Sequence, residues 1–163
     1  MMTIRPYQPE DCATLASLFF HTVHTINAAD YSTEQLQVWA TGTVDLAAWN
    51  TAFLAHITNI AEIETTIVGF ADRTRSGYLD RLFVHHQYQR MSVATALCDA
   101  LEADFSGVIT TQASITAKPF FEQRGYRVLC SQQVERQGVF LTNYRIEKRI
   151  LPEKSPQNGV TLS

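Results

Sequence analysis

The chain has 163 residues and a mass of 18.4 kDa, which is the size of one domain that can bury a hydrophobic core. Hydrophobic residues make up 45% and charged residues 18% of the chain, so the composition excludes wholesale disorder. A net charge of −3 and a pI of about 5.9 argue against a large basic face, so neither nucleic acid nor a membrane is expected as a partner.

The first half of the chain is expected to form one short strand and then helices. Residues 3–6 are expected as a strand that a proline ends, and a helix follows from Pro9 with an apolar stripe at helical spacing. Ser32 and Gln35 have the spacing of a capping box for a second helix. A third helical segment covers about residues 45–56.

After residue 56 the pattern changes to strands. Strands are expected at 57–63, 66–72 and 78–84, then a helix from Ser92 to Phe105, a strand at 108–113 and a helix at 116–124. Residues 128–136 and 139–146 form a hairpin around Gln137-Gly138, and the chain from Leu151 is expected to be a loose or peripheral tail. This order predicts an α+β or mixed α/β fold in which helices cover both faces of one sheet.

Targeting and metal-binding patterns are not seen. Three cysteines, Cys12, Cys98 and Cys130, are scattered without a C-x-x-C pair, which indicates neither a zinc knuckle nor a disulfide framework. The start has no apolar signal-peptide region, and no run of about 18 apolar residues occurs. The sequence therefore favours a cytoplasmic protein with free thiols.

One strand, residues 78–84, leads through a polar loop directly into a helix. Free N–H groups and the helix dipole favour an anion at such a helix start. The first turn, Ser92 to Thr95, contains no acid, Arg90 precedes it, and the acids Asp99, Glu102 and Asp104 lie later in the helix. This charge order leaves room for a phosphate, although the acids can also form an ordinary solvated face.

Two segments around this helix resemble signatures of the GCN5-related N-acetyltransferases, the GNAT superfamily. Gln89-Arg90-Met91-Ser92-Val93-Ala94 is similar to the Q/R-x-x-G-x-G/A signature, and residues 117–126 are similar to the A-x-x-F-Y-E-x-x-G-F segment. The resemblance covers about residues 2–150. It implies an N-acetyltransferase domain over residues 1–150, with residues 151–163 as a tail. It also implies a mixed, mostly antiparallel sheet of about seven strands.

The resemblance implies acetyl-coenzyme A as the acyl donor. The pantetheine amides would pair with backbone groups of Leu82, Phe83 and Val84, and an amide near Val84 would be the oxyanion donor. Phe120 and Phe121 are expected either to pack near the pantetheine arm or to belong to the core. The pyrophosphate would lie on the loop and first helical turn, formed by Gln89, Arg90, Met91, Ser92, Val93, Ala94 and Thr95.

Two residues depart from the family pattern. Ser92 stands where the family usually has glycine, whose missing Cβ lets the backbone approach a phosphate closely. Phe121 stands where many members carry a tyrosine that protonates the departing thiolate, so another group must supply that proton or the thiolate leaves unaided.

Amine acetylation needs a neutral amine. The pKa of an alkyl ammonium group is about 10.4, so a base is required at neutral pH. Asp80 is the first candidate and Tyr78 a weaker acid candidate, since strand alternation places both on one face with Leu82. A surface ion pair is the alternative for Asp80. His21 and His24, one helical turn apart and near Tyr31, are candidates for acceptor binding. They lack a third ligand, so no metal is expected.

The sequence thus favours an N-acetyltransferase that transfers an acetyl group to a primary amine of a small molecule or peptide, by direct attack in a ternary complex. A non-catalytic acyl-coenzyme A binding or sensing module is the main alternative, which Phe121 favours. A structural interaction domain without a cofactor is a third interpretation. The resemblance is compatible with a homodimer.

Overall fold

A computed structural model of the chain describes residues 1–152, and the expected tail from residue 153 onward lies outside the described residues. One seven-stranded sheet has the strand order β1-β2-β3-β4-β5-β7-β6. Within residues 1–152, β4 and β5 are the one pair that runs parallel, which confirms the mixed, mostly antiparallel sheet. The strands are β1 (Met2–Pro6), β2 (Ile57–Ile63), β3 (Thr66–Arg73), β4 (Tyr78–Val84), β5 (Gly107–Ser114), β6 (Arg127–Arg136) and β7 (Val139–Ile150).

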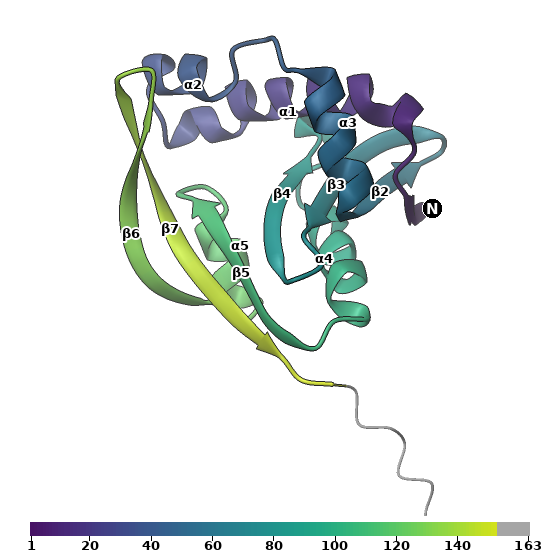
Figure 1. Cartoon of the computed structure of the whole chain (residues 1–163). Helices are drawn as coiled ribbons and strands as arrows, with labels where there is room; N and C mark the ends of the chain where they lie inside the picture. The colour runs from purple at the N-terminus through teal and green to yellow at the C-terminus, as the bar shows by residue number, and fades with distance from the viewer. Residues whose placement is uncertain (153–163) are drawn as a thin grey trace, which may run out of the picture.

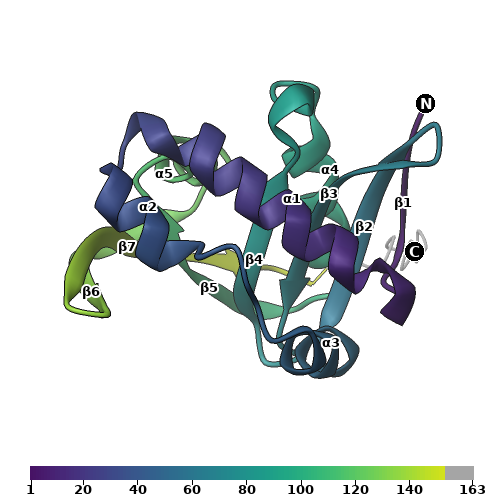
Figure 2. The same cartoon turned by 90° about the horizontal axis from the view of Figure 1, so that it is seen from above.

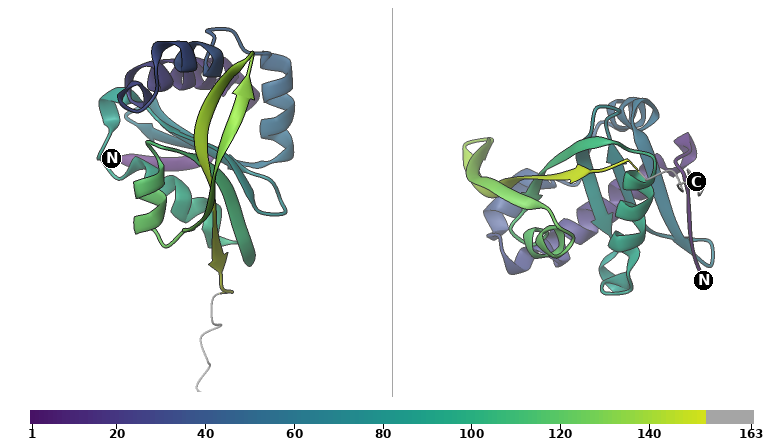
Figure 3. Two further views of the ribbon diagram at one scale, coloured as in Figure 1. Left: turned by 90° about the vertical axis from the view of Figure 1, so that its left-hand side faces the viewer. Right: turned by 90° about the horizontal axis from the view of Figure 1, so that it is seen from below.

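Helices lie on both faces of this sheet, as predicted (Figures 1 and 2). One face carries α1, α2 and α3, and the opposite face carries α4 and α5 (Figure 3). The helices are α1 (Cys12–Thr25), α2 (Thr33–Trp39), α3 (Leu46–Ala55), α4 (Val93–Ala103) and α5 (Lys118–Gln123), with short 3₁₀ turns at Pro9–Asp11, Asn27–Ala29 and His86–Tyr88.

Several element boundaries differ from the predictions by one or a few residues, and two of these differences have a visible cause. The helix expected at 116–124 is shorter, because Ser114 Oγ accepts the Ala117 N–H at 3.0 Å and holds the preceding residues in a turn. The strand expected to end at Ile146 continues to Ile150, because it remains paired with β5 as far as Gly107. Neither contact is visible in local sequence. The capping box of α2 is confirmed, since Ser32 Oγ accepts the Gln35 N–H at 3.1 Å.

Each face of the sheet has its own hydrophobic core. Phe53, Ile60 and Phe70 are fully buried in the core beneath α1 and α3. The second core, beneath α4, contains Leu97, Leu101 and other residues from β3, β5 and β7. The central strands therefore carry apolar side chains on both faces, which explains their long apolar runs.

Glu102 on α4 joins three elements of the second layer. Its carboxylate accepts hydrogen bonds from Arg124 Nε at 2.7 Å and Lys148 Nζ at 2.9 Å, and the Tyr126 hydroxyl donates to it at 3.2 Å. Its side chain is only 11% exposed, whereas that of Asp99, which also pairs with Arg124, is 66% exposed. The solvated-face interpretation therefore fails for Glu102, which is an internal anchor between α4, the end of α5 and β7.

Replacing Glu102 by glutamine should lower the free energy of unfolding by about 2 kcal/mol at pH 7, because Arg124 and Lys148 lose a half-buried counterion. Burial alone would raise the pKa of Glu102, but the hydrogen bonds from Arg124 and Lys148 outweigh it and hold the pKa below its ordinary value. Such a carboxylate stabilises the fold above its unfolded pKa, and this stabilisation is lost as the pH falls through the folded pKa. Urea denaturation at several pH values measures the difference.

The difference between Glu102→Gln and the unmodified protein should shrink as the pH falls below about 4.3. Asp99→Asn is the matched control, and it should cost less than about 0.5 kcal/mol because its carboxylate is exposed. A stability loss in Glu102→Gln that stays constant down to acidic pH would contradict this assignment.

Candidate active site

The sheet opens where the parallel pair of β4 and β5 ends. β4 and β5 pair at Tyr78↔Thr110 and Leu79↔Thr111 and then diverge, as Figure 1 shows. The space between them is part of a cavity of about 730 Å³ whose walls come from both helical layers. A parallel pair that stops after two residues leaves backbone N–H and C=O groups on both strands without strand partners. The cavity is therefore lined by backbone groups that can hydrogen-bond a ligand.

The edge of β4 that faces this cavity follows from the phase of its ladder with β3. His85 donates its N–H to the Val68 carbonyl at 2.8 Å, and hydrogen-bonded pairs alternate with non-bonded pairs in an antiparallel ladder. Phe83 therefore bonds β3 through its backbone, whereas the backbone groups of Leu82 and Val84 point toward the cavity. The expectation for Phe83 is corrected in this respect, because only its side chain can contribute to the cavity wall.

The carbonyl of Val84 already has two partners. Thr22 Oγ1 donates to it at 3.0 Å from α1, and Gln89 Nε2 donates to it at 2.8 Å from the following loop. Gln89 therefore holds the loop against the end of β4 through its side chain. The N–H of Val84 points in the same direction as its carbonyl and is the group left to bind a ligand oxygen.

The start of α4 has no protein cap. Ser92 is the N-cap residue with φ of 64°, its side chain makes no capping hydrogen bond, and the first turn has no acid. The first amides of a helix have no intrahelical acceptor, so those of Val93, Ala94 and Thr95 are available at the cavity wall. By contrast, Asp45 Oδ1 caps α3 by accepting the Ala48 N–H at 3.0 Å. The start of α4 is thus suited to an anion.

The loop before α4 has the backbone conformation that explains the family's glycine. Both Arg90, with φ of 61°, and Ser92 are left-handed, a conformation that costs an L-residue about 1 kcal/mol. Glycine would adopt it without that cost. Serine keeps the turn, so the departure at position 92 preserves the local geometry.

A second glycine, Gly69 on β3, brings α4 close to the sheet. A Cβ at this position would lie 2.8 Å from Val93 Cγ1, so that something would have to shift, and at a tight 3.1 Å from Leu97 Cδ1. The absence of a side chain at position 69 therefore places the first turn of α4 directly beside the end of β4.

Asp80 lies at a β-bulge, which corrects the predicted alternation. Asp72 pairs with Arg81, but the next residue, Arg73, pairs with Leu79, so Asp80 is an extra residue on β4. Leu79 and Leu82 both lie in the core beneath α4, whereas Arg81 stacks over Trp49 on the other face. Strict alternation predicted that Leu82 and Asp80 share one face of β4. This prediction is wrong, because the bulge places them on different faces. The bulge turns Asp80 and Arg81 together toward Asp72.

Asp80 and Arg81 belong to a charged cluster at the cavity wall. Arg81 Nη1 lies 2.8 Å from Asp72 Oδ2 and 3.2 Å from Asp80 Oδ2, and His56 Nδ1 lies 2.8 Å from Asp72 Oδ2. Asp72 is fully buried, and burial raises its pKa although Arg81 and His56 oppose the shift. Asp80 is 35% exposed, so it is the carboxylate of this cluster that reaches the cavity.

The same cluster is the one place in residues 1–152 where three potential metal-ligating groups meet. Ligand atoms of His56, Asp72 and Asp80 lie within 4.8 Å of one another. The Arg81 guanidinium already supplies a positive charge to both carboxylates there, which argues against a metal cation at this position.

The aromatic candidates divide between cavity and core. Tyr78 lines the cavity, and burial together with Asp80 raises the pKa of its hydroxyl, so it is protonated at neutral pH. Phe121 is 2% exposed and packs against Tyr126 in the core beneath α4, with one edge in the cavity wall. Phe120 lines the cavity and is partly buried on the same core. Both phenylalanines therefore have a packing role.

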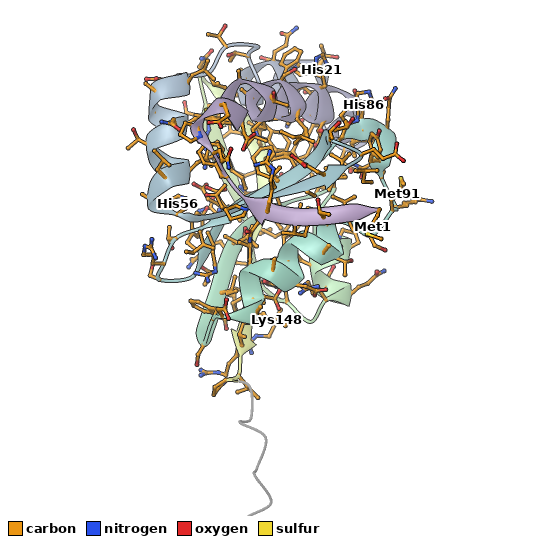
Figure 4. The ribbon with its side chains drawn as sticks, turned by 90° about the vertical axis from the view of Figure 1, so that its right-hand side faces the viewer. Met1, His21, His56, His86, Met91 and Lys148 are labelled. Carbon is orange, nitrogen blue, oxygen red and sulfur yellow. The ribbon has the colours of Figure 1, made fainter. Side chains whose placement is uncertain are left out.

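The histidine candidates for acceptor binding lie outside the cavity wall of the described chain. His24 Nε2 bonds the Ala40 carbonyl at 2.7 Å and thereby joins α1 to the segment after α2. His21 lies near His86, with ring centroids 6.3 Å apart (Figure 4). The residues that do line the cavity from this part of the chain are Phe19 and Thr22 of α1 and Ile26 directly after it.

Tyr31 lines the cavity, but its hydroxyl is used by the fold. It donates to the Thr142 carbonyl at 2.7 Å and accepts the Ile115 N–H at 2.9 Å. Burial raises the pKa of this hydroxyl, so it remains a donor at neutral pH. Tyr31 therefore positions the cavity wall by connecting the end of α1 to β7 and to the turn after β5.

Sequence reasoning missed the polar residues that β5 and β7 contribute to the cavity. Gln112, Ser114 and Asn143 line it together with Asn27 from the turn after α1. Helical periodicity through Phe19, Thr22 and Ile26 could have identified the cavity-facing side of α1. The residues on β5 and β7 depend on the strand register and had no local signal.

Comparison with known proteins agrees with this architecture. Residues 27–148 match the family described as acetyltransferase (GNAT) domain. The chain is 38% identical over 141 residues to an uncharacterized N-acetyltransferase, YafP, of Escherichia coli strain K12, covering 86% of this chain and 91% of that protein. This chain therefore belongs to the GNAT family and is an N-acetyltransferase.

Solved structures show the same fold. A GCN5-related N-acetyltransferase from Rhodopseudomonas palustris has a TM-score of 0.85 and 35% identity, over 90% of this chain and 94% of its own. The PaiA N-acetyltransferase of Thermoplasma acidophilum, solved with coenzyme A, has a TM-score of 0.72 and 15% identity over 91% of this chain and 99% of its own. Within residues 1–152, no helix combines the length and apolar character needed to cross a bilayer.

Proposed function

We propose that this chain transfers the acetyl group of acetyl-coenzyme A to a primary amine by direct attack in a ternary complex. The observation that carries the proposal is the meeting of an uncapped helix start with the unpaired edge of β4 in one cavity. A helix start binds phosphate groups, and an unpaired strand edge binds an extended chain that contains amides. The donor contains both.

The donor side is formed by β4, the following loop and α4. The amides of the loop and first turn, from Gln89 through Thr95, bind the pyrophosphate. The backbone groups of Leu82 pair with a pantetheine amide, and the Val84 N–H donates to the thioester oxygen as negative charge develops there. Phe120 covers the arm from the α5 side.

The acceptor side is formed by the α1–α2 layer and the charged cluster. Asp80 takes one proton of the ammonium group, directly or through a water molecule, and the neutral amine nitrogen then forms a bond to the acetyl carbon. The carbon–sulfur bond breaks, and the second proton lost from the nitrogen passes to solvent. Tyr78 is the proposed acid, because it keeps its proton at neutral pH and lines the same cavity. A thiol with a pKa of about 8.5 is also a good enough leaving group to depart as the thiolate without an acid.

A binding or sensing module remains the second candidate function, and Phe121 is the observation that favours it. The side chain at this position has no proton to donate and is fixed in the core. A sensor would bind the donor but not consume it, so the two functions differ in turnover.

Thiol release separates these functions. The purified protein is mixed with acetyl-coenzyme A and each of a panel of primary amines, and free thiol is followed with a thiol reagent while mass spectrometry detects the acetylated amine. We expect amine-dependent thiol release with matching product. A rise in melting temperature with acetyl-coenzyme A but no amine-dependent thiol release from any amine would support the sensor instead.

A further inference from the structure

The acceptor half of the cavity contains two asparagine side chains without protein partners in the described part of the chain. Asn27 is only 6% exposed and lines the cavity, and its side chain makes no hydrogen bond within residues 1–152, but its amide atoms are not among those fully buried without a partner. Asn143 also lines the cavity, and its Oδ1 is buried without a hydrogen-bond partner. Buried polar groups without partners are costly, so such groups in a cavity wall indicate what the cavity binds.

The two asparagines lie on the acceptor face of the sheet. Asn143 pairs with Ser114 across β7 and β5, next to the Ala113↔Tyr144 pair, whose side chains face the core beneath α4. Alternation therefore directs Asn143 toward the α1–α2 layer. Asn27 follows α1 in that layer, and Tyr31, four residues later, donates to the carbonyl of Thr142, the neighbour of Asn143.

The two asparagine side chains favour a neutral hydrogen-bonding group. A side-chain amide both donates and accepts hydrogen bonds, and the buried Oδ1 of Asn143 needs a donor. A carboxylate has no donor to offer to this oxygen, and the Arg81 guanidinium in the cavity wall is already shared by Asp72 and Asp80. A carboxamide or hydroxyl group satisfies both asparagines.

We infer that the amine acceptor carries a neutral hydrogen-bonding group, a carboxamide or a hydroxyl, next to its amine, and that Asn27 and Asn143 bind this group. The inference rests on the proposed function, because it assigns part of the same cavity to the acceptor. The aromatic side chains of Phe19, Trp39 and Trp49 line the remaining wall and accommodate an apolar part of the acceptor.

Two matched series of amines test this inference. Phenylalanine amide, phenylalaninol, phenylalanine and 2-phenylethylamine share one skeleton and differ only beside the amine; glycinamide, ethanolamine, glycine and ethylamine form the smaller series. Within a series, kcat/KM for the carboxamide or the alcohol should exceed that for the plain amine by about tenfold or more. Comparing kcat/KM of the carboxamide with that of the alcohol shows which of these two neutral groups the site prefers.

The variants Asn27→Leu and Asn143→Leu should each bring this ratio toward one. A ratio between two substrates is independent of the fraction of enzyme that folds, so partial misfolding does not affect it. Asn50→Leu is the matched control, because Asn50 accepts from the Tyr7 hydroxyl outside the cavity wall, and it should keep the ratio.

Three outcomes would overturn the inference. A plain amine as good as its carboxamide and alcohol would remove its basis, and so would an unchanged ratio in both asparagine variants. A free amino acid as the best acceptor would point instead to Arg136, a guanidinium in the cavity wall with no carboxylate partner in residues 1–152. In each of these cases transfer still occurs, so the proposed function stands. No transfer to any amine would refute the proposed function and this inference together.

Discussion

Replacing Asp80 by asparagine should lower kcat about 100-fold at neutral pH and leave the affinity for acetyl-coenzyme A nearly unchanged. Asparagine has the size and hydrogen-bonding shape of aspartate but cannot take a proton, and a general base contributes at least this factor to rate. In the proposed arrangement Asp80 lies on the acceptor side of the cavity and the donor binds the backbone of β4 and α4, so donor binding should not depend on the charge of Asp80. Steady-state kinetics and calorimetry measure the two quantities.

The pH dependence distinguishes a base from a structural carboxylate. The deficit of Asp80→Asn should shrink as the pH rises toward the pKa of the amine, about 10.4 for an alkyl amine, because solvent then deprotonates the acceptor. Asp99→Asn, an exposed carboxylate outside the cavity wall, is the control and should keep the normal rate. Equal losses of rate and donor affinity in Asp80→Asn, or a deficit that is constant with pH, would refute its role as the base.

Replacing Ser92 by glutamate should weaken acetyl-coenzyme A binding about 100-fold, because a carboxylate at the start of α4 would repel the pyrophosphate and compete for the free amides. Ser92→Gln is the matched control, since it has the same size and the same left-handed backbone strain without the charge. Titration calorimetry at low salt gives both dissociation constants. The difference between the two variants should decrease as salt is added.

A glutamate variant that binds acetyl-coenzyme A as tightly as the glutamine variant would place the phosphates elsewhere. A loss of affinity that is the same in both variants would show that side-chain size, and not charge, matters at position 92. The melting temperatures of the ligand-free variants should be similar, because neither side chain is buried there.

Local sequence was sufficient for the framework of this protein. The alternating and apolar runs identified each strand, and the Ser32–Gln35 capping box identified the start of α2, because these signals depend on neighbours within a few residues. The loop before α4 was recognisable for the same reason, since its acid-free first turn and its resemblance to the GNAT signature lie in one continuous segment.

Tertiary structure alone decided which side chains share the cavity. The bulge that turns Asp80 toward Asp72 depends on the register between β3 and β4, and the pairing of Asn143 with Ser114 depends on that between β5 and β7. The sequence predicted His24 as an acceptor-binding residue, but its Nε2 forms a hydrogen bond with the carbonyl of Ala40, which is distant in sequence. A one-residue change of register exchanges the two faces of a strand, so long-range pairing, which no local pattern encodes, determines which side chains of β4, β5 and β7 reach the cavity.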